Sequence, residues 1–569
     1  MKAKKISFTP EKIWNIVIFA FFAWFIFAFL IFPNLNTIVS VFFQDGQFTT
    51  VSFDKLIHSA KAMKSLRNSL ILAPALSITV GFVGISLVLI TEYFDIKGAK
   101  ILRLGYMIYG GIILVSGYKF IYGKTGILTT LFAKIIPGFP IDWFEGFWAV
   151  LFVMTFACTS NHMIFLRNAM RAVDFQTVEA AQNMGASQFR ILTKVVLPVL
   201  TPSLLAVTIL TFITGLSATS APLLVGGQEF QTITPMILTF SGNVSSRPLA
   251  ALLALFLGVA TILLLTVMIQ IEKRGHYMSI SKVKTTIIKQ KIRNPILNVL
   301  VHIYAYVLFL IYVIPVVLVV LFSFTDAATI ASKKLTLSSF TLDNYISIFQ
   351  KATSYKPFVV SICYSAIAAL LVAVIVLVAC RIIQKRKDRL GSALEYGLLI
   401  PWLLPTTLMA LGLITTYNTP RFWMLNQVLT GTSVIMLIGY MIIKIPFTLR
   451  MTKAAFFALD DSLEDASRNL GAKPLYTFLR VQLPIILPTV LAIFALNFNG
   501  LLGDYDMSVF MYHPLNQPLG VYIKSLTNSE TNADNAALTF VYAVLMMVIS
   551  AIVMYLVYGR GNKVDKREK

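Results

Sequence analysis

Long stretches of apolar residues dominate this chain, and only short polar segments separate them. Twelve such stretches are about twenty residues or longer, and a helix of about twenty residues crosses the hydrocarbon core of a bilayer. We therefore predict an all-α polytopic membrane protein with about twelve transmembrane helices. The predicted spans lie near residues 13–32, 69–91, 101–122, 146–166, 191–215, 249–271, 297–323, 358–382, 394–416, 428–449, 482–502 and 536–558.

Basic residues between the spans predict how the chain is oriented. Lys and Arg gather before the first span, between residues 272 and 296, between Arg381 and Arg389, and after residue 562. Loops on the cytoplasmic side of a membrane are enriched in Lys and Arg. With twelve spans all four segments fall on one side, so we predict that the N- and C-termini are cytoplasmic.

Composition agrees with a membrane protein and argues against nucleic-acid binding. The 569 residues are 57% hydrophobic and 13% charged, with a net charge of +23. The positive charges are spread over loops next to spans, so topology and contact with anionic lipid of the bilayer explain them. Cys158, Cys363 and Cys380 lie in apolar stretches without metal-ligand spacing, which indicates reduced packing residues. We predict no metal site and no cofactor.

An internal repeat divides the chain. A polar segment that contains Gly185 recurs around Gly471, 286 positions later, and each copy is followed at the same distance by a Leu-Pro pair at Pro198 or Pro484. The copies are six spans apart, an even number, so they face the same side and the halves are parallel six-helix repeats. The predicted domains are a first half at 1–271 with its loop at 167–190, a basic cytoplasmic linker at 272–296, and a second half at 297–569 with its loop at 453–476.

Each polar loop has the pattern of an amphipathic helix. Apolar residues such as Phe175 and Val178, or Leu463 and Leu470, recur at helical spacings. A glycine follows each helix where a left-handed residue would end it. One alternative is a helix that lies flat on lipid headgroups, but such a helix favours Lys and Arg on its polar face. These helices carry acids instead, which favours docking on a protein.

The loops resemble the EAA loop of bacterial ATP-binding-cassette (ABC) importer permeases, and the fusion of two halves in one chain looks most like the ferric-iron permeases of that family. The resemblance implies a bacterial inner-membrane protein whose loops dock on a homodimeric ABC ATPase and which receives its solute from an external substrate-binding protein. The docking residues that it implies are Glu179, Ala180, Ala181, Gly185 and Ala186 in the first loop and Asp465, Ala466, Ser467, Gly471 and Ala472 in the second.

Two other classes of protein share some of these features. A secondary transporter of the major-facilitator kind also has twelve spans, but its signature loop lies between the second and third spans of each half, whereas here the loop lies between the fourth and fifth. A membrane-embedded enzyme is the other alternative. The segment from Gly117 to Thr125 is similar to a phosphate-binding loop, but it has five residues between its glycines instead of four. Five scattered histidines form no catalytic constellation, so we predict no catalytic residues and ATP hydrolysis on a separate subunit.

The cargo is less strongly indicated than the transporter class. The resemblance favours ferric iron, and its relatives carry 2-aminoethylphosphonate, thiamine or polyamines. Many family members have an acidic-aromatic pair where this chain has Ala218-Thr219, while Asp504-Tyr505 is kept in the second half. Polar residues at membrane depth usually line a path, although Ser and Thr also bond to helical carbonyls. The predicted pathway residues are Thr214, Ser217, Thr219, Asn497, Asn499, Asp504 and Asp506.

The two loops are predicted to be unequal in charge. Asp460, Asp461 and Glu464 add negative charge to the second loop. Exposed charges are screened over about 8 Å at physiological ionic strength. We therefore predict that the second ATPase contact is the more sensitive to salt.

Overall fold

Helices form almost all of the structure, which is a computed structural model. It describes residues 10–44, 46–106, 112–170, 173, 175–274, 289–386, 388–457, 459, 462–528 and 533–561. Within those residues, nine helices are long and apolar enough to cross a membrane, and two bent helix pairs bring the number to eleven. The predicted all-α polytopic fold is confirmed. The remaining predicted span, near 101–122, falls on α5 (Ala99–Tyr106) and α6 (Ile112–Tyr122), which flank residues outside the described part.

The chain packs as two compact units that do not follow the predicted repeat boundary. Unit 1 contains Met1–Ser52, Ile348–Ser525 and Leu545–Lys569, and unit 2 contains Phe53–Ser347 and Leu526–Val544. The first span of each predicted half therefore packs with helices of the other half. The repeat is a property of the sequence, whereas the units are a property of packing. Residues 275–288 of the predicted linker lie outside the described part.

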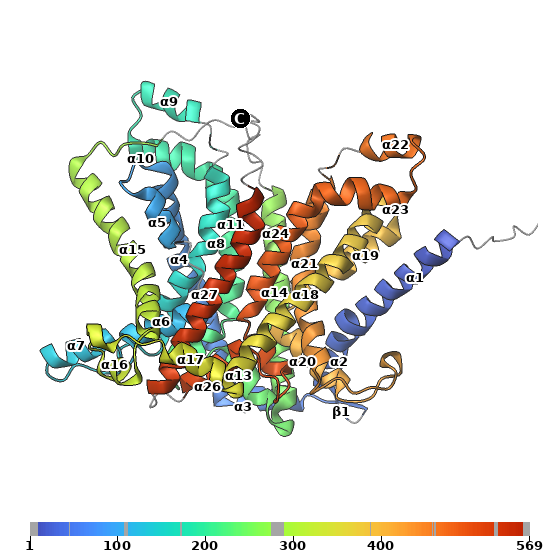
Figure 1. Cartoon of the computed structure of the whole chain (residues 1–569), viewed down its shortest axis with the longest axis horizontal. Helices are drawn as coiled ribbons and strands as arrows, with labels where there is room; N and C mark the ends of the chain where they lie inside the picture. Colours follow the sequence, from blue (N-terminus) through green and yellow to red (C-terminus); the bar gives the residue numbers. More distant parts are fainter. Residues whose placement is uncertain are drawn as a thin grey trace, which may run out of the picture. The chain divides into compact units, whose positions relative to one another are not determined.

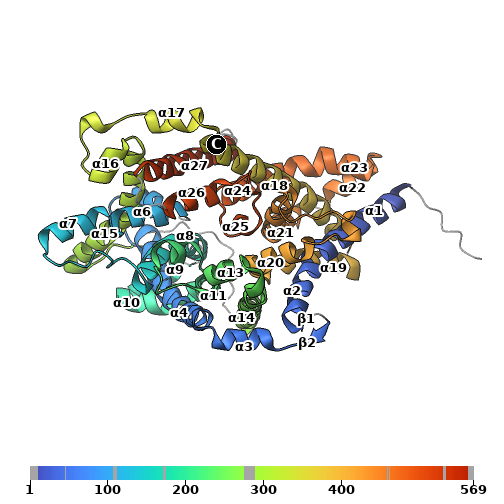
Figure 2. The ribbon, with the colours of Figure 1, turned by 90° about the horizontal axis from the view of Figure 1, so that it is seen from below.

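Unit 1 is built around α18, which lies along α21 and α24, and around α2, which lies along α20 (Figure 2). Its apolar core joins Phe29 near the N-terminus to Ala368 and Ile442. The helical elements of unit 1 are α1 (Pro10–Phe25), η1 (Ile26–Ile31), α2 (Phe32–Phe42), α18 (Ala352–Lys385), α19 (Arg389–Leu399), η6 (Ile400–Trp402), α20 (Thr406–Tyr417), η7 (Phe422–Met424), α21 (Ser433–Phe457), α22 (Ser462–Asn469), α23 (Pro474–Thr477), η8 (Phe478–Gln482), α24 (Leu483–Leu502), α25 (Ser508–Met511), most of α26 (Leu519–Asn528) and the second part of α27 (Ala533–Gly561); a short hairpin of β1 (Phe43–Gln44) and β2 (Gln47–Phe48) follows α2.

Specific bonds attach the N-terminal helices to the rest of unit 1. The Trp24 indole donates to the Trp423 carbonyl at 3.1 Å, and the Tyr417 hydroxyl donates to the carbonyl of Ala28. Gly412 lets α20 approach α2 closely, because a Cβ at this position would stand 2.9 Å from the Pro33 carbonyl oxygen. The predicted span 394–416 is not one straight helix, since α19 and α20 meet at a bend of 103°.

Unit 2 is built around α4, which packs along α8 and α11 (Figure 1). Helix α15 packs on α5 and α6, where the Tyr106 hydroxyl donates to the Ala305 carbonyl at 2.6 Å and the Tyr118 hydroxyl donates to the Ile311 carbonyl at 3.2 Å. Besides α5 and α6, the helical elements of unit 2 are most of α3 (Val51–His58), α4 (Ala60–Val88), η2 (Leu89–Tyr93), α7 (Ile127–Ile135), α8 (Phe147–Met170), α9 (Phe175–Asn183), α10 (Gln188–Ile191), η3 (Leu192–Val196), α11 (Leu197–Leu216), α12 (Ser220–Val225), α13 (Ile233–Ser241), η4 (Val244–Ser246), α14 (Arg247–Arg274), α15 (Pro295–Ser323), α16 (Ala327–Ser332), η5 (Leu337–Ser339), most of α17 (Asp343–Gln350) and the start of α27.

Candidate docking loops and translocation pathway

The first predicted docking loop is a short helix, α9, followed by a turn and the single-turn helix α10. Phe175 and Val178 are buried on the inner side of α9, at 3% and 0% exposure. Glu179 lies on the outside. Two large apolar side chains flank the turn without cover, Met184 at 81% exposure and Phe189 at 76%. The loop therefore presents an acid and two apolar residues outward.

The turn after α9 has the geometry predicted from its glycine. Gly185 has φ +81°, a conformation that favours glycine. The Ala186 amide donates to the Ala181 carbonyl at 3.0 Å, which closes the helix in a Schellman motif. The second loop repeats this turn, with Gly471 at φ +82° and the Ala472 amide donating to the Ser467 carbonyl at 3.1 Å. The prediction of two left-handed glycines is confirmed.

The end of the predicted linker holds the first loop. The Gln182 amide group donates to the side chain of Gln290 at 2.6 Å, and the Gln188 side chain donates to the Lys291 carbonyl at 2.6 Å. Gln290 also forms a parallel bridge with Phe94, at the end of the span that contains α4. Polar side-chain amides thus connect α9 and α10 to the chain that enters α15.

An ion pair holds the second loop. Both terminal nitrogens of Arg381 donate to the carboxylate of Glu464 at 2.9 Å, so α22 is fastened to the end of α18 by a bidentate contact. The Gln482 side chain donates to the same carboxylate at 3.1 Å. The hydrogen bonds from Arg381 hold the pKa of Glu464 below its ordinary value, although partial burial opposes them.

The outward face of the second loop matches that of the first. Leu470 and Leu475, at 89% and 69% exposure, stand where the first loop has Met184 and Phe189. Ser467 points inward, where its hydroxyl bonds to that of Thr477 at 2.8 Å. Among the predicted docking residues, Glu179, Ala180, Gly185, Asp465, Ala466 and Gly471 are exposed, Ala181, Ala186 and Ala472 are half-buried, and Ser467 is buried. Asp460 and Asp461 lie outside the described residues.

The predicted pathway residues of the first half bond to their own backbone. Thr214 donates to the Leu210 carbonyl and Ser217 to the Ile213 carbonyl, both at 2.9 Å. Thr219 donates to the Ser217 carbonyl at 3.1 Å. These bonds satisfy the hydroxyls locally, so the role of these three residues in transport stays a prediction.

The predicted pathway residues of the second half join neighbouring elements. Asn497 donates to the Thr448 hydroxyl at 2.7 Å, and Asn499 donates to the Ser550 carbonyl at 3.5 Å. The Asp504 carboxylate accepts from the backbone amides at the start of α25, at 3.0 and 3.2 Å. Asp506 is exposed. The structure gives the first three side chains a packing role, and a role in transport stays a prediction for all four.

A charged residue in a span escaped the sequence prediction. Lys444 is half-buried near the middle of α21, and its ammonium stands 2.8 Å from the position of a Cβ on Gly500. Asp504, just after the end of α24, is its electrostatic neighbour. A single lysine inside the apolar stretch 428–449 was the available signal, since charge at membrane depth usually marks a functional position. Within the described residues, no group of three or more His, Cys, Asp or Glu side chains could hold a metal ion.

Comparisons with known proteins agree with this architecture. Residues 372–563 match the family of binding-protein-dependent transport system inner membrane components. The probable ABC transporter permease protein y4fN of Sinorhizobium fredii is 38% identical over 94% of both chains. The ferric transport system permease protein FbpB of Actinobacillus pleuropneumoniae is 21% identical over 93% of this chain and 76% of its own. The putative 2-aminoethylphosphonate transport system permease protein PhnV of Salmonella paratyphi A is 26% identical over 42% of this chain and 90% of its own. The chain therefore belongs to the inner-membrane permease components of binding-protein-dependent ABC transport systems, a family of multi-pass membrane proteins of bacteria.

Proposed function

We propose that this permease imports ferric iron, that an external binding protein delivers the iron, and that α9 and α22 each dock on one subunit of a homodimeric ABC ATPase. The docking loops must then lie in the cytoplasm. If each half has the predicted even number of spans, both chain termini lie on that same side. The permease itself has a transport role, and the ATPase performs the hydrolysis.

The observation that carries this proposal is the matched outward face of the two loops. Each loop presents one acid, Glu179 or Asp465, and a pair of exposed apolar side chains around a glycine turn. Large apolar side chains that stand isolated on a polar loop gain most from a groove in a partner. Two such faces in one chain fit a partner with two equivalent grooves.

A charge placed on the apolar pair tests the docking. Met184→Asp and Leu470→Asp should each reduce co-purification of the ATPase and solute uptake at least tenfold, because a carboxylate would have to be buried in an apolar groove. Asn183→Asp and Asn469→Asp are matched controls, since they add the same charge at exposed neighbouring positions. Uptake driven by a proton gradient in vesicles that contain only this chain would refute the proposal.

The relationship to FbpB over 93% of the chain supports iron as the cargo. Cells with and without this permease should differ in uptake of radiolabelled ferric iron. A deficit confined to another solute would exclude iron without affecting the docking proposal.

The second candidate cargo is 2-aminoethylphosphonate. The relationship to PhnV and the Lys444 ammonium inside a span favour it, because an ammonium binds the oxygens of a phosphonate. Lys444→Met should then abolish phosphonate uptake, with Lys444→Arg as the charge-preserving control. If Lys444→Met leaves phosphonate uptake unchanged, the alternative is wrong.

A further inference from the structure

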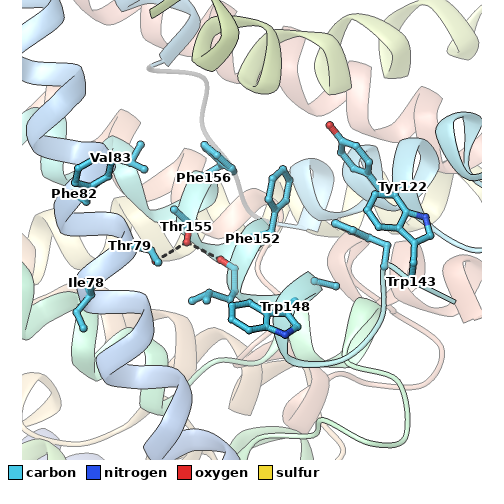
Figure 3. Close-up of a pocket in the computed structure, with 13 residues that line it drawn as sticks. Ile78, Thr79, Phe82, Val83, Tyr122, Trp143, Trp148, Phe152, Thr155 and Phe156 are labelled. Carbon is cyan, nitrogen blue, oxygen red and sulfur yellow. Dashed lines mark hydrogen bonds between the residues drawn. The ribbon is translucent and has the colours of Figure 1, made fainter. Parts of the chain in front are cut away.

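A cavity of about 640 Å³ lies between α4 and α8 in unit 2, next to the end of α6 (Figure 3). Phe82 and Val83 of α4 face Phe152 and Phe156 of α8 across it, and Tyr122 and Trp143 close one end. The volume is typical of a site for a small ligand. Its position on two candidate spans places it within the thickness of the bilayer.

The wall of this cavity is almost entirely apolar. Its two threonines, Thr79 and Thr155, are bonded to each other at 2.7 Å and to carbonyls of their own helices. The rest of the wall is aliphatic and aromatic. The wall contains no charged side chain, and a charged ligand would lose hydration here without gaining an ion pair, so the chemistry selects a hydrocarbon.

Three large apolar side chains at the rim of the cavity are exposed. Ile78 is 72% exposed, Phe82 is 66% exposed and Trp148 is 74% exposed. All three belong to candidate spans. Large apolar side chains on a span are at no disadvantage when the surrounding solvent is lipid, because lipid tails are as apolar as leucine.

Two positions of this wall correspond to small, buried residues in the second half. The positions 286 residues after Phe82 and Val83 are Ala368 and Ala369, both at 0% exposure. Ala368 belongs to the apolar core of unit 1 together with Phe29 of the N-terminal segment. In the second half these two positions carry small buried residues, whereas in the first half bulky aromatic residues surround an open space.

We propose that this cavity binds an acyl chain of a bilayer phospholipid. The aromatic end formed by Tyr122 and Trp143 would lie nearest the headgroup, since Trp and Tyr concentrate at membrane interfaces. The cavity lies along the first half of α8, and the other end of α8 leads directly to α9. A bound chain would therefore stabilise the packing of the helix that carries the first docking loop.

Quenching of Trp148 fluorescence tests whether lipid occupies the cavity of the wild-type protein. The full chain is reconstituted in vesicles of phosphatidylcholine with bromine in the middle of the acyl chains, and is then exchanged into detergent. The emission of Trp148, taken as the difference between wild type and Trp148→Phe, should stay quenched at least twofold after the exchange. The emission of Trp402, which is 42% exposed and is not part of the cavity wall, should recover after the exchange. Equal recovery of both tryptophans would overturn the proposal.

A variant that fills the cavity provides a second, independent test. Val83→Phe places a ring in the cavity and should remove one retained phospholipid per chain in native mass spectrometry. Leu70→Phe is the matched control, because Leu70 lies on the same helix at 59% exposure and is not part of the wall. If Val83→Phe retains as many phospholipids as Leu70→Phe, the cavity is not a lipid site. The quenching of wild-type Trp148 decides the question if Val83→Phe does not insert.

Discussion

The two docking loops share an outer face but are fastened to the membrane helices by different chemistry. Val178 in the first loop is fully buried, and the residue 286 positions later is Glu464, whose carboxylate Arg381 binds. Gly185 and Gly471 nevertheless have nearly equal φ angles. The outward geometry is thus the same, while the inner attachment combines apolar burial with uncharged amide hydrogen bonds in the first loop and uses an ion pair in the second. Because the outer faces are alike and the inner attachments differ, we expect the outer faces to perform the docking that both loops share.

The ion pair changes how salt is expected to act. The extra acids of the second loop predicted a salt-sensitive ATPase contact. Glu464 faces inward and is 21% exposed, and its partner Arg381 is 13% exposed. The charge of Glu464 therefore attaches α22 to α18 through the ion pair with Arg381. Salt screens this partly buried ion pair less than it screens an exposed one. Asp465 is the acid among the described residues that corresponds to Glu179 and faces outward.

The largest effects are expected where the loops are alike. Gly185→Val and Gly471→Val should each reduce uptake more than tenfold and to a similar extent. A β-branched residue at φ near +80° costs roughly 1–3 kcal/mol of backbone strain. A Cβ at either position meets no atom within 4 Å, so we expect the loss to come from this strain and not from a steric clash. Uptake by whole cells measures the loss. The Gly→Asn variants should retain more uptake, because Asn tolerates this backbone conformation. A clear difference in uptake between the two Val variants would show that the two turns are not equivalent.

A smaller, unequal effect is expected from the inner attachments. Arg381→Met removes the bidentate contact with Glu464, while Gln482 and Lys385 remain near the same carboxylate, so α22 should loosen and ATPase binding should fall several-fold. Val178→Ala in the first loop should cost about 1–2 kcal/mol through lost apolar burial. Limited proteolysis of the loops at low and high salt measures both. Adding Glu464→Gln to Arg381→Met should recover part of the loss, and a salt response in Val178→Ala would contradict an uncharged attachment of the first loop.

The pH dependence of the second loop follows from the lowered pKa of Glu464. A carboxylate whose pKa is lowered on folding contributes stability above its ordinary pKa of about 4.3, and this contribution is lost as the pH falls through the lowered value. The protection factor of the α22 amides, which is the intrinsic exchange rate divided by the observed rate, should therefore be constant from about pH 8 to pH 5 and should fall only in stronger acid. Glu464→Gln is the control, and a protection factor that falls already between pH 7 and 5 would show that another group titrates.

Local sequence was sufficient to predict the spans and the glycine turns but not the attachments. An apolar stretch of about twenty residues must cross the bilayer whatever it packs against, and Gly185 marks its own helix end. The partner of Glu464 is 83 positions away at Arg381, and no local pattern identifies it. The bend between α19 and α20 could have been found, because Pro401 and Pro405 interrupt that predicted span. The packing of the N-terminal helices with the second half depends on tertiary contacts alone.

The smallest effect is expected from Ser467, which differs from Ala181 in the first loop by one hydroxyl. That hydroxyl is buried and bonds to Thr477, whose counterpart in the first loop is the buried Ile191. Ser467→Ala leaves Thr477 with its second bond, to the Lys473 carbonyl at 3.3 Å, so the cost should be about 0.5–1.5 kcal/mol. Ser467→Ala combined with Thr477→Ile reproduces the first loop and should restore stability. A double-mutant cycle on thermal unfolding of the detergent-solubilised chain measures the coupling, and ATPase affinity should stay constant throughout. A tighter ATPase complex with Ser467→Ala would show that the hydroxyl acts on the docking face, and the inner and outer roles assigned to the two faces would then be wrong.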